Sequence, residues 1–348
     1  MELLVFNYSM NRDSQVFSHQ RTVVRQLSKH FSHIDVITAE AFQDSAIDGV
    51  SVYSTNWIAG RKIRNIVNFY RIAIPLLLKH KGGKIFSHMT EVQTALSLPI
   101  SKLLGIKHFL WYAHKSASRF LYFSYPQVDG VVTSTPGSCP ISGNKVFPIG
   151  QAVDTKLSKQ ITKLPELPPK KWYHVGRIDP SKNLDLIIEA LLPFHKKNSE
   201  ITLDLYGAPS SKKTNNYFEA LKQRFSTPEY SSWVFFHGSI SHERLSEISL
   251  KHDAFIHAFW GSLDKALVEA ILHKRIVISS NPEYLREFCN SAIQEKEISQ
   301  ELNRQLEEIY SFSSERLIND IQKKNKVALR EHSLEEWISR LTYILRSK

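Results

Sequence analysis

The sequence predicts an α/β protein of two domains, each with a parallel β-sheet and crossover helices. Short apolar runs rich in β-branched residues alternate with amphipathic stretches along the chain, which is the pattern of parallel strands connected by helices. The chain has 348 residues, more than a single ordinary core supports, and this length fits two domains.

The first alternation covers the N-terminal half. We expect its strands at residues 3–7, 35–38, 84–87, 108–112, 130–133 and 145–149. Amphipathic stretches predict helices near 16–31, 61–80 and 90–104. Residues 156–171, KLSKQITKLPELPPKK, are rich in lysine and proline and lack an apolar period, which indicates an interdomain linker.

A second alternation follows the linker. We expect strands at 172–175, 202–206, 233–236, 254–257 and 275–279, with helices near 184–196, 216–225, 242–251 and 265–273. The last segment, SLEEWISRLTYILRS, is an amphipathic helix. The predicted domains are therefore 1–160 and 161–330, followed by a C-terminal helix at 331–348.

Composition narrows the class of protein. Hydrophobic residues make up 42% and charged residues 23%, as in ordinary globular proteins. Two distant cysteines offer no disulfide framework, and no signal peptide or apolar stretch of spanning length is found. We expect a cytoplasmic protein, either soluble or peripheral on the inner face of the membrane.

The formal net charge of +11 is compatible with nucleic acid, an anionic membrane or phosphate-bearing substrates. Nucleic acid is the least favoured partner, because the cations are spread along the chain and no nucleic-acid motif is found. Residues 60–84, GRKIRNIVNFYRIAIPLLLKHKGGK, interleave cations with apolar residues. Either this helix lies on an anionic membrane, or its apolar stripe packs on its own sheet. We favour sheet packing for the apolar residues, with the cations adding weak membrane attraction.

The segment YHVGRIDPSKNLDLIIEALL contains a strand that runs into Gly176 and Arg177, then a turn, Lys182 and a helix. Ligands of open α/β sheets bind beyond the carboxyl ends of strands. The arginine fork and the lysine point charge can together hold a diphosphate and stabilise it as a leaving group. The alternative is a surface loop with two solvated cations.

The segment DAFIHAFWGSLDKALVEAILHKRIVISSN contains a strand, a loop with Gly261, and a helix that begins near Asp264. Amides at the helix start and the helix dipole form a candidate anion site. Glu269 lies among apolar residues of this helix and needs a partner. Ribose hydroxyls of a ligand or a salt bridge to Lys265 can supply it.

Both segments resemble the donor-site signatures of glycosyltransferase family 4, retaining enzymes of the GT-B fold that use nucleotide sugars. The first resembles the strand–GR–turn–Lys–helix motif, and the second resembles the E-x₇-E region with Glu269 as the final glutamate. ITLDLYGAP and WVFFHGSISHERLSEI resemble the segments that flank the nucleobase, while FLWYAH and VFPIGQAVDT resemble parts of the N-terminal domain. The resemblance covers most of the chain from about Ser87.

The resemblance implies two Rossmann-like domains facing across a cleft, with the last helix packing back on the first domain. The first domain binds the acceptor and the second binds the donor. The resemblance places catalytic roles on Arg177, Lys182 and His114, and we add Asp264 as the acidic residue nearest to Gly261. Substrate contacts would fall on Glu269, Gly176, Ser262, Leu263, Lys265, Gly207 and Ile240. Within these sets Arg177 and Lys182 clamp the diphosphate, Glu269 binds the ribose, and His114 faces the transferred sugar.

Two departures from the family pattern stand out. Gly261 occupies the position of the first glutamate of E-x₇-E, and Asp264 is the nearest acidic substitute. The loop after the first strand lacks the paired glycines of many relatives, and it offers Arg12 and Ser14 instead.

The absence of a D-x-D motif leads us to expect no metal and no cofactor, with Arg177 and Lys182 neutralising the diphosphate. His30 and His33 lack a clear third ligand, so we expect a solvated helix surface there.

The expected reaction transfers a sugar from UDP or GDP to a hydroxyl of a glycan or lipid-linked acceptor, in polysaccharide or glycoconjugate biosynthesis. Two alternatives stay open. A nucleotide-sugar epimerase of the same architecture would need a dedicated acid–base set, which we do not find. A non-catalytic, glycosyltransferase-like binding subunit is compatible with Gly261.

Overall fold

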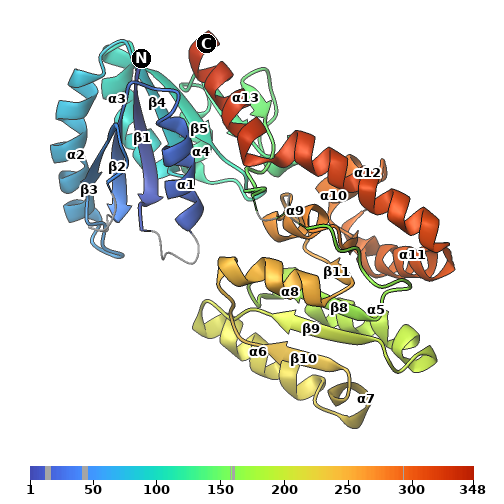
Figure 1. Ribbon diagram of the computed structural model, residues 1–348. Helices are drawn as coiled ribbons and strands as arrows, with labels where there is room; N and C mark the ends of the chain where they lie inside the picture. The colour runs from blue at the N-terminus through green and yellow to red at the C-terminus, as the bar shows by residue number, and fades with distance from the viewer. Residues whose placement is uncertain (12–16, 41–45, 157, 159–160, 293) are drawn as a thin grey trace. The chain divides into compact units, whose positions relative to one another are not determined.

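The computed structural model describes residues 1–11, 17–40, 46–156, 158, 161–292 and 294–348. These residues form two compact α/β units, each built around its own parallel sheet (Figure 1). The first unit consists of Met1–Ala152 and Leu334–Lys348, and the second consists of Val153–Ser333. The chain therefore leaves the first unit once and returns to it with its last helix.

The sheet of the first unit has seven strands, and every pairing in it is parallel. Its strands are β1 Glu2–Ser9, β2 His33–Glu40, β3 Val50–Ser54, β4 Lys84–His88, β5 Lys107–Trp111, β6 Gly130–Thr133 and β7 Val146–Pro148. Their order across the sheet is β3, β2, β1, β4, β5, β6, β7. β1 pairs with both β2 and β4, so the strand order reverses at β1.

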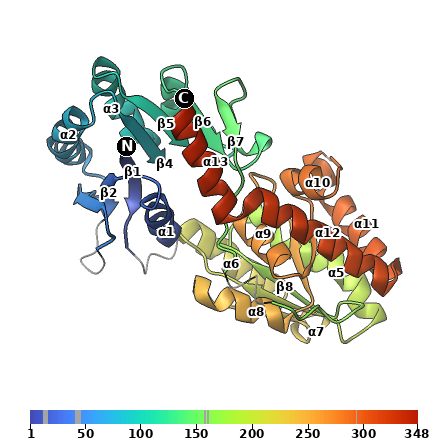
Figure 2. The ribbon, with the colours of Figure 1, turned by 45° about the horizontal axis from the view of Figure 1, so that its top comes forward.

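Helices cover both faces of this sheet (Figure 2). The helices are α1 Ser18–Leu27, α2 Lys62–Lys79, α3 Glu91–Leu103, α4 Arg119–Ser124 and the C-terminal α13 Leu334–Ser347, with a short 3₁₀ turn at Pro136–Ser138. α1 and α13 share one apolar core, and α2, α3 and α4 pack on the opposite face. On α13, Trp337 is fully buried against the rings of Phe86 and Trp111. The prediction that the last helix packs back on the first domain is confirmed.

The sheet of the second unit has five parallel strands: β8 Lys171–Val175, β9 Thr202–Tyr206, β10 Val234–His237, β11 Ala254–His257 and β12 Ile276–Ser279. Their order is β10, β9, β8, β11, β12, so the order reverses at β8. The helices are α5 Leu184–Lys197, α6 Lys212–Arg224, α7 Pro228–Ser231, α8 Leu245–Lys251, α9 Lys265–Leu272, α10 Pro282–Phe288, α11 Ile298–Ser311 and α12 Ser314–His332. Short 3₁₀ turns lie at Pro180–Lys182, His242–Arg244 and Glu295–Glu297. Separate apolar cores fill the two faces.

Two parallel α/β domains of the predicted kind are therefore confirmed, and most predicted elements agree with the observed ones within a few residues. The sequence predicts no strand at β3, because this edge strand is at most half-buried and lacks an apolar run. The predicted helix at 16–31 is too long, since α1 ends at Leu27 and His33 already begins β2. Arg12 and Ser14 lie outside the described residues. No helix in the described ranges is long and apolar enough to cross a membrane.

The substitution Trp337→Ala tests how α13 is held on the first unit. It should lower the free energy of unfolding by about 3–5 kcal/mol, because it leaves a large cavity in the core. The control Tyr343→Ala lies on the same helix, where Tyr343 is 72% exposed, and should change stability by less than about 0.5 kcal/mol. Urea unfolding followed by circular dichroism compares the two; equal losses would contradict packing through the Trp337 face.

Candidate functional site

Two loops meet at the carboxyl edge of the second unit's sheet. One follows β8 and contains residues 176–183, and the other follows β11 and contains residues 258–264. β8 and β11 are neighbours at the reversal of strand order, which is where open α/β sheets bind ligands. The Asn183 side chain joins the loops, because its Nδ2 donates a hydrogen bond to the Ala258 carbonyl at 2.8 Å.

Glycines follow three adjacent strands at this edge: Gly176 after β8, Gly207 after β9 and Gly238 after β10. The Gly207 N–H donates to the Gly238 carbonyl at 3.2 Å. A Cβ atom on Gly207 would lie 1.8 Å from the Gly176 oxygen, and the φ of Gly207 is +151°. Both facts restrict this position to glycine. Gly207 is therefore required because its backbone packs directly against the loop after β8.

Lys182 and Asp264 form an ion pair between the two loops. Nζ of Lys182 lies 2.5 Å from Oδ2 of Asp264 and 4.0 Å from the centroid of the Phe259 ring. Lys182 is only 7% exposed, so its charge would be costly to bury without these partners. The sequence suggests separate roles for Lys182 and Asp264, whereas the structure joins them in one charge pair.

Asp264 makes two further contacts besides this ion pair. Its Oδ1 accepts the N–H of Ala266 at 3.3 Å and so caps α9. Its Oδ2 lies 3.3 Å from Nε2 of His257. Burial raises the pKa of the Asp264 carboxyl, but Lys182 and His257 outweigh this effect and the pKa lies well below its ordinary value. Asp264 is therefore a carboxylate whose two oxygens are already engaged.

His257 on β11 is fully buried behind Asp264. Burial lowers its pKa, so the ring is neutral near neutral pH. Its Nε2–H donates to Asp264, and the Ser279 hydroxyl donates to Nδ1 at 2.9 Å. Neighbouring His174 on β8 donates from Nδ1 to the Ile256 carbonyl at 2.9 Å, and burial lowers the pKa of His174 to about 3. Two neutral histidines thus lie beneath the ion pair.

An aromatic ring lies against position 261, where the E-x₇-E pattern has its first glutamate. A Cβ atom on Gly261 would lie 2.2 Å from the Phe259 ring. Asn281 fixes this loop, since its Nδ2 donates to the carbonyls of Phe259 at 2.9 Å and Ser262 at 3.1 Å. A glutamate at 261 would displace Phe259, the same ring that covers Lys182. The missing glutamate is evident from the sequence, whereas the packing of Phe259 against Gly261 is evident only from the structure.

The other predicted residues of this unit differ in exposure. Arg177 is exposed at the end of β8, in contrast to Lys182. Glu269 is 6% exposed on α9. Half-buried positions are Gly176, Gly207, Ile240, Ser262 and Lys265, while Leu263 is buried. Arg177 is therefore the predicted cation that faces solvent at this edge.

His114 belongs to the first unit, where it follows β5 and is exposed. Its Nδ1 accepts the Ser116 N–H at 3.1 Å and lies 2.6 Å from the Ser116 hydroxyl. The Tyr112 hydroxyl donates to the Ser116 carbonyl at 2.7 Å and holds this turn. Because Nδ1 accepts, the neutral ring carries its proton on Nε2. The bonds to Ser116 thus orient the His114 ring and leave its Nε2–H as a hydrogen-bond donor.

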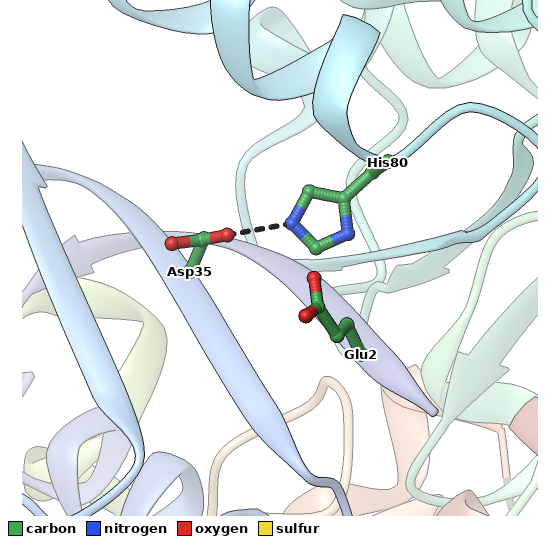
Figure 3. Close-up of side chains that lie close together, drawn as sticks. All are labelled: Glu2, Asp35 and His80. Atoms are coloured by element: carbon green, nitrogen blue, oxygen red, sulfur yellow. Dashed lines mark hydrogen bonds and ion pairs between the residues drawn. The ribbon is translucent and has the colours of Figure 1, made fainter.

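A second cluster of polar side chains lies at the amino edge of the first unit's sheet (Figure 3). Glu2, Asp35 and His80 bring ligand atoms within 4.8 Å of one another. Nε2 of His80 lies 2.7 Å from Oδ2 of Asp35, but Nζ of Lys79 lies 2.6 Å from the same oxygen. An ammonium therefore already neutralises this carboxylate, and the cluster is an ion-pair network. His33 starts β2, with Nε2 3.4 Å from Oδ1 of Asp35, so the predicted solvated helix surface is wrong for His33.

The pair Gly261→Ala and Gly238→Ala tests the packing of Phe259. Gly261→Ala should lower the free energy of unfolding by about 1–3 kcal/mol, because the new Cβ overpacks the loop. A Cβ on Gly238 meets nothing within 4 Å, so the matched control should be much less affected. In a Phe259→Ala background the effect of Gly261→Ala should disappear in urea unfolding; an undiminished loss there would refute the clash.

Asp264→Asn tests the ion pair through its pH dependence. The variant should be less stable by roughly 2 kcal/mol near neutral pH, because Lys182 loses its counter-ion. The folded pKa of Asp264 is lowered, so its stabilisation is present above the unfolded pKa of about 4 and is lost as pH falls below it. The stability difference should therefore shrink in acid. Glu307→Gln, at an exposed carboxylate of α11, is the control. A stability difference between wild type and Asp264→Asn that does not change with pH would contradict this assignment.

Comparison with known proteins finds a matching family model and solved structures of similar fold. Residues 157–323 match the family model of Glycosyl transferases group 1. No curated protein matches the chain.

Solved structures are similar over the whole chain. A glycosyltransferase from Rickettsia africae has a TM-score of 0.74 at 12% identity and covers 99% of this chain and 98% of its own. Anabaena Alr3699/HepE in complex with UDP and glucose has a TM-score of 0.73 at 13% identity, and the same protein with UDP-glucose has 0.71 at 12%, both covering 100% of each chain. These identities establish the fold alone. Residues 157–323 are thus similar to Glycosyl transferases group 1, within a chain that has the GT-B fold.

Proposed function

We propose that this protein transfers a sugar from a nucleoside-diphosphate sugar to an acceptor hydroxyl, with retention of the anomeric configuration. The observation that carries the proposal is the junction of the β8 and β11 loops, where exposed Arg177 and the buried Lys182–Asp264 pair lie at the strand-order reversal. The family match of residues 157–323 supports the reaction class. UDP-glucose in the HepE structure supports UDP as the nucleotide, with GDP as the alternative.

The donor diphosphate would bind at the two loops. Arg177 offers a planar pair of donors to phosphate oxygens. Lys182 has three N–H donors, of which one is directed at Asp264, and the others remain for phosphate. Asp264 holds the ammonium in place through the ion pair, so we assign it as a positioning residue for Lys182.

The nucleoside would bind along the same edge. We assign contacts with the nucleoside to Gly176 and Gly207, and an apolar contact with the base to Ile240, as the family resemblance implies. Glu269 would accept hydrogen bonds from the ribose hydroxyls. Further contacts to phosphate or sugar are assigned to Ser262, Leu263 and Lys265, as the family resemblance implies.

In the reaction the bond between the anomeric carbon and the diphosphate oxygen breaks, and a bond to the acceptor oxygen forms. The acceptor proton passes to the departing diphosphate. Arg177 and Lys182 would stabilise the charge that develops there, and such preorganised donors contribute strongly to catalysis. His114 would contact the transferred sugar through Nε2–H. The proposal includes no metal, since Arg177 and Lys182 would donate hydrogen bonds to the diphosphate.

The acceptor class follows from the same resemblance. We propose a glycan or lipid-linked hydroxyl, in polysaccharide or glycoconjugate biosynthesis at the cytoplasmic side of a membrane. Gly261 favours one alternative, a binding subunit that holds the donor without turnover.

Arg177→Ala tests the central assignment. It should lower turnover by about 100-fold or more, because one donor to the developing charge is lost, while thermal stability stays unchanged at this exposed position. Lys213→Ala removes an exposed cation on α6 and is the control. UDP release from UDP-glucose with a panel of acceptors is the measurement.

Near-normal turnover of Arg177→Ala would remove the central claim. Wild-type protein that binds UDP-glucose but releases no UDP with any acceptor would favour the binding subunit. Conversion of the donor sugar without an acceptor would favour an epimerase.

A further inference from the structure

Helix α2 has a buried face on the sheet of the first unit. Phe69, Ala73, Leu76 and Leu77 pack with apolar residues of β1, β2 and β4. Packing on its own sheet, which the sequence analysis favours for this helix, is confirmed for these residues. They account for only part of the apolar side chains of α2.

A second apolar stripe runs along the outside of the same helix. Ile63 is 81% exposed, Val67 59%, Ile74 41% and Leu78 58%. The intervals of four, seven and four residues place these side chains on one side of the helix. We call these four residues the outer stripe. An exposed row of this kind requires an explanation, because single exposed apolar residues are ordinary but aligned ones are not.

The loop before α2 contains one more exposed apolar residue. Ile58 is 41% exposed. The buried side chain of Asn65 fixes it, since the Ile58 N–H donates to Oδ1 of Asn65 at 3.0 Å and Nδ2 of Asn65 donates to the Ile58 carbonyl at 2.7 Å. These two hydrogen bonds tie the loop to α2. α2 lies on the outside of the first unit in both ribbon views (Figures 1 and 2).

The charged residues of α2 and of the segments next to it in the sequence are all cationic. Exposed cations on and next to α2 are Arg61, Lys62, Arg64, Arg71 and Lys81. No aspartate or glutamate occurs between Asp48 and Glu91. Arg64 and Arg71 lie seven residues apart and therefore border the stripe along its length. The face is thus apolar along its middle and positive at its margin.

We propose that this face of α2 docks on the surface of an anionic lipid bilayer. The outer stripe would enter the boundary between head groups and acyl chains, and the cations would contact anionic head groups, as amphipathic helices do when they lie in the plane of a membrane. A second copy of this chain is a poorer occupant, because a twofold contact would bring two positive faces together. The docking is independent of glycosyl transfer and is measured without donor.

Flotation of the purified full chain with vesicles tests the proposal. The protein should float with vesicles of equal parts phosphatidylcholine and phosphatidylglycerol, and much less with phosphatidylcholine alone. Arg64→Gln with Arg71→Gln should lower the partition coefficient about 25-fold, because each cation near an anionic surface contributes about fivefold. Ile63→Ser with Val67→Ser should lower it at least about tenfold through lost apolar burial.

Matched controls distinguish binding through this face of α2 from nonspecific binding to vesicles. Leu103→Ser removes an apolar side chain of α3 that is 87% exposed, and Lys212→Gln with Lys213→Gln removes two exposed cations of α6. Both should leave binding near the wild-type value. All these positions are exposed, and thermal melting confirms that each variant is folded.

Three results would overturn the proposal. One is absence of wild-type flotation with anionic vesicles. Another is equal loss of binding in the α2 variants and the controls. The third is a wild-type dimer in solution that Ile63→Ser with Val67→Ser converts to a monomer, because a second copy would then cover the outer stripe.

Discussion

The ion pair between Lys182 and Asp264 is the interaction on which the candidate site depends. Lys182 ends the turn after β8 and Asp264 begins the helix after β11, so the pair joins the two loops at the strand-order reversal. Burying a lysine without a counter-ion is costly. His257 contacts that counter-ion, Asp264, and is itself bonded to Ser279. The pair therefore sets both the shape and the charge of this edge.

In the same loop, the Phe259 ring occupies the space beside Gly261 where the E-x₇-E pattern has a glutamate side chain. The ring covers the Cα of Gly261 and lies against the Lys182 ammonium. An acidic side chain at 261 would displace this ring and add a second carboxylate beside Asp264. The loop therefore holds a single carboxylate, and that carboxylate is committed to Lys182. In this chain the charge balance of the loop differs from that expected of E-x₇-E.

The cationic side chains that give the chain its net positive charge lie in different environments. Lys182 is neutralised by Asp264, and Lys79 by Asp35. Arg177 is exposed at the carboxyl edge of the second sheet, and the cations of α2 border an apolar stripe on the first unit. Net charge alone cannot separate these groups, because it contains no information about burial or neighbours.

The sequence by itself determined the two parallel α/β domains and the positions of the two loops, because strand and helix periodicity and glycine-containing turns are local signals. It also identified Arg177 and Lys182 as candidates. Only the tertiary structure decided that Lys182 is buried against Asp264 while Arg177 is exposed. Residues 182 and 264 are far apart along the chain, and their contact depends on β8 and β11 being neighbours. The sequence likewise did not determine that the outer stripe of α2 is exposed. Periodicity shows that a helix has apolar positions, but it does not show which of them another element covers.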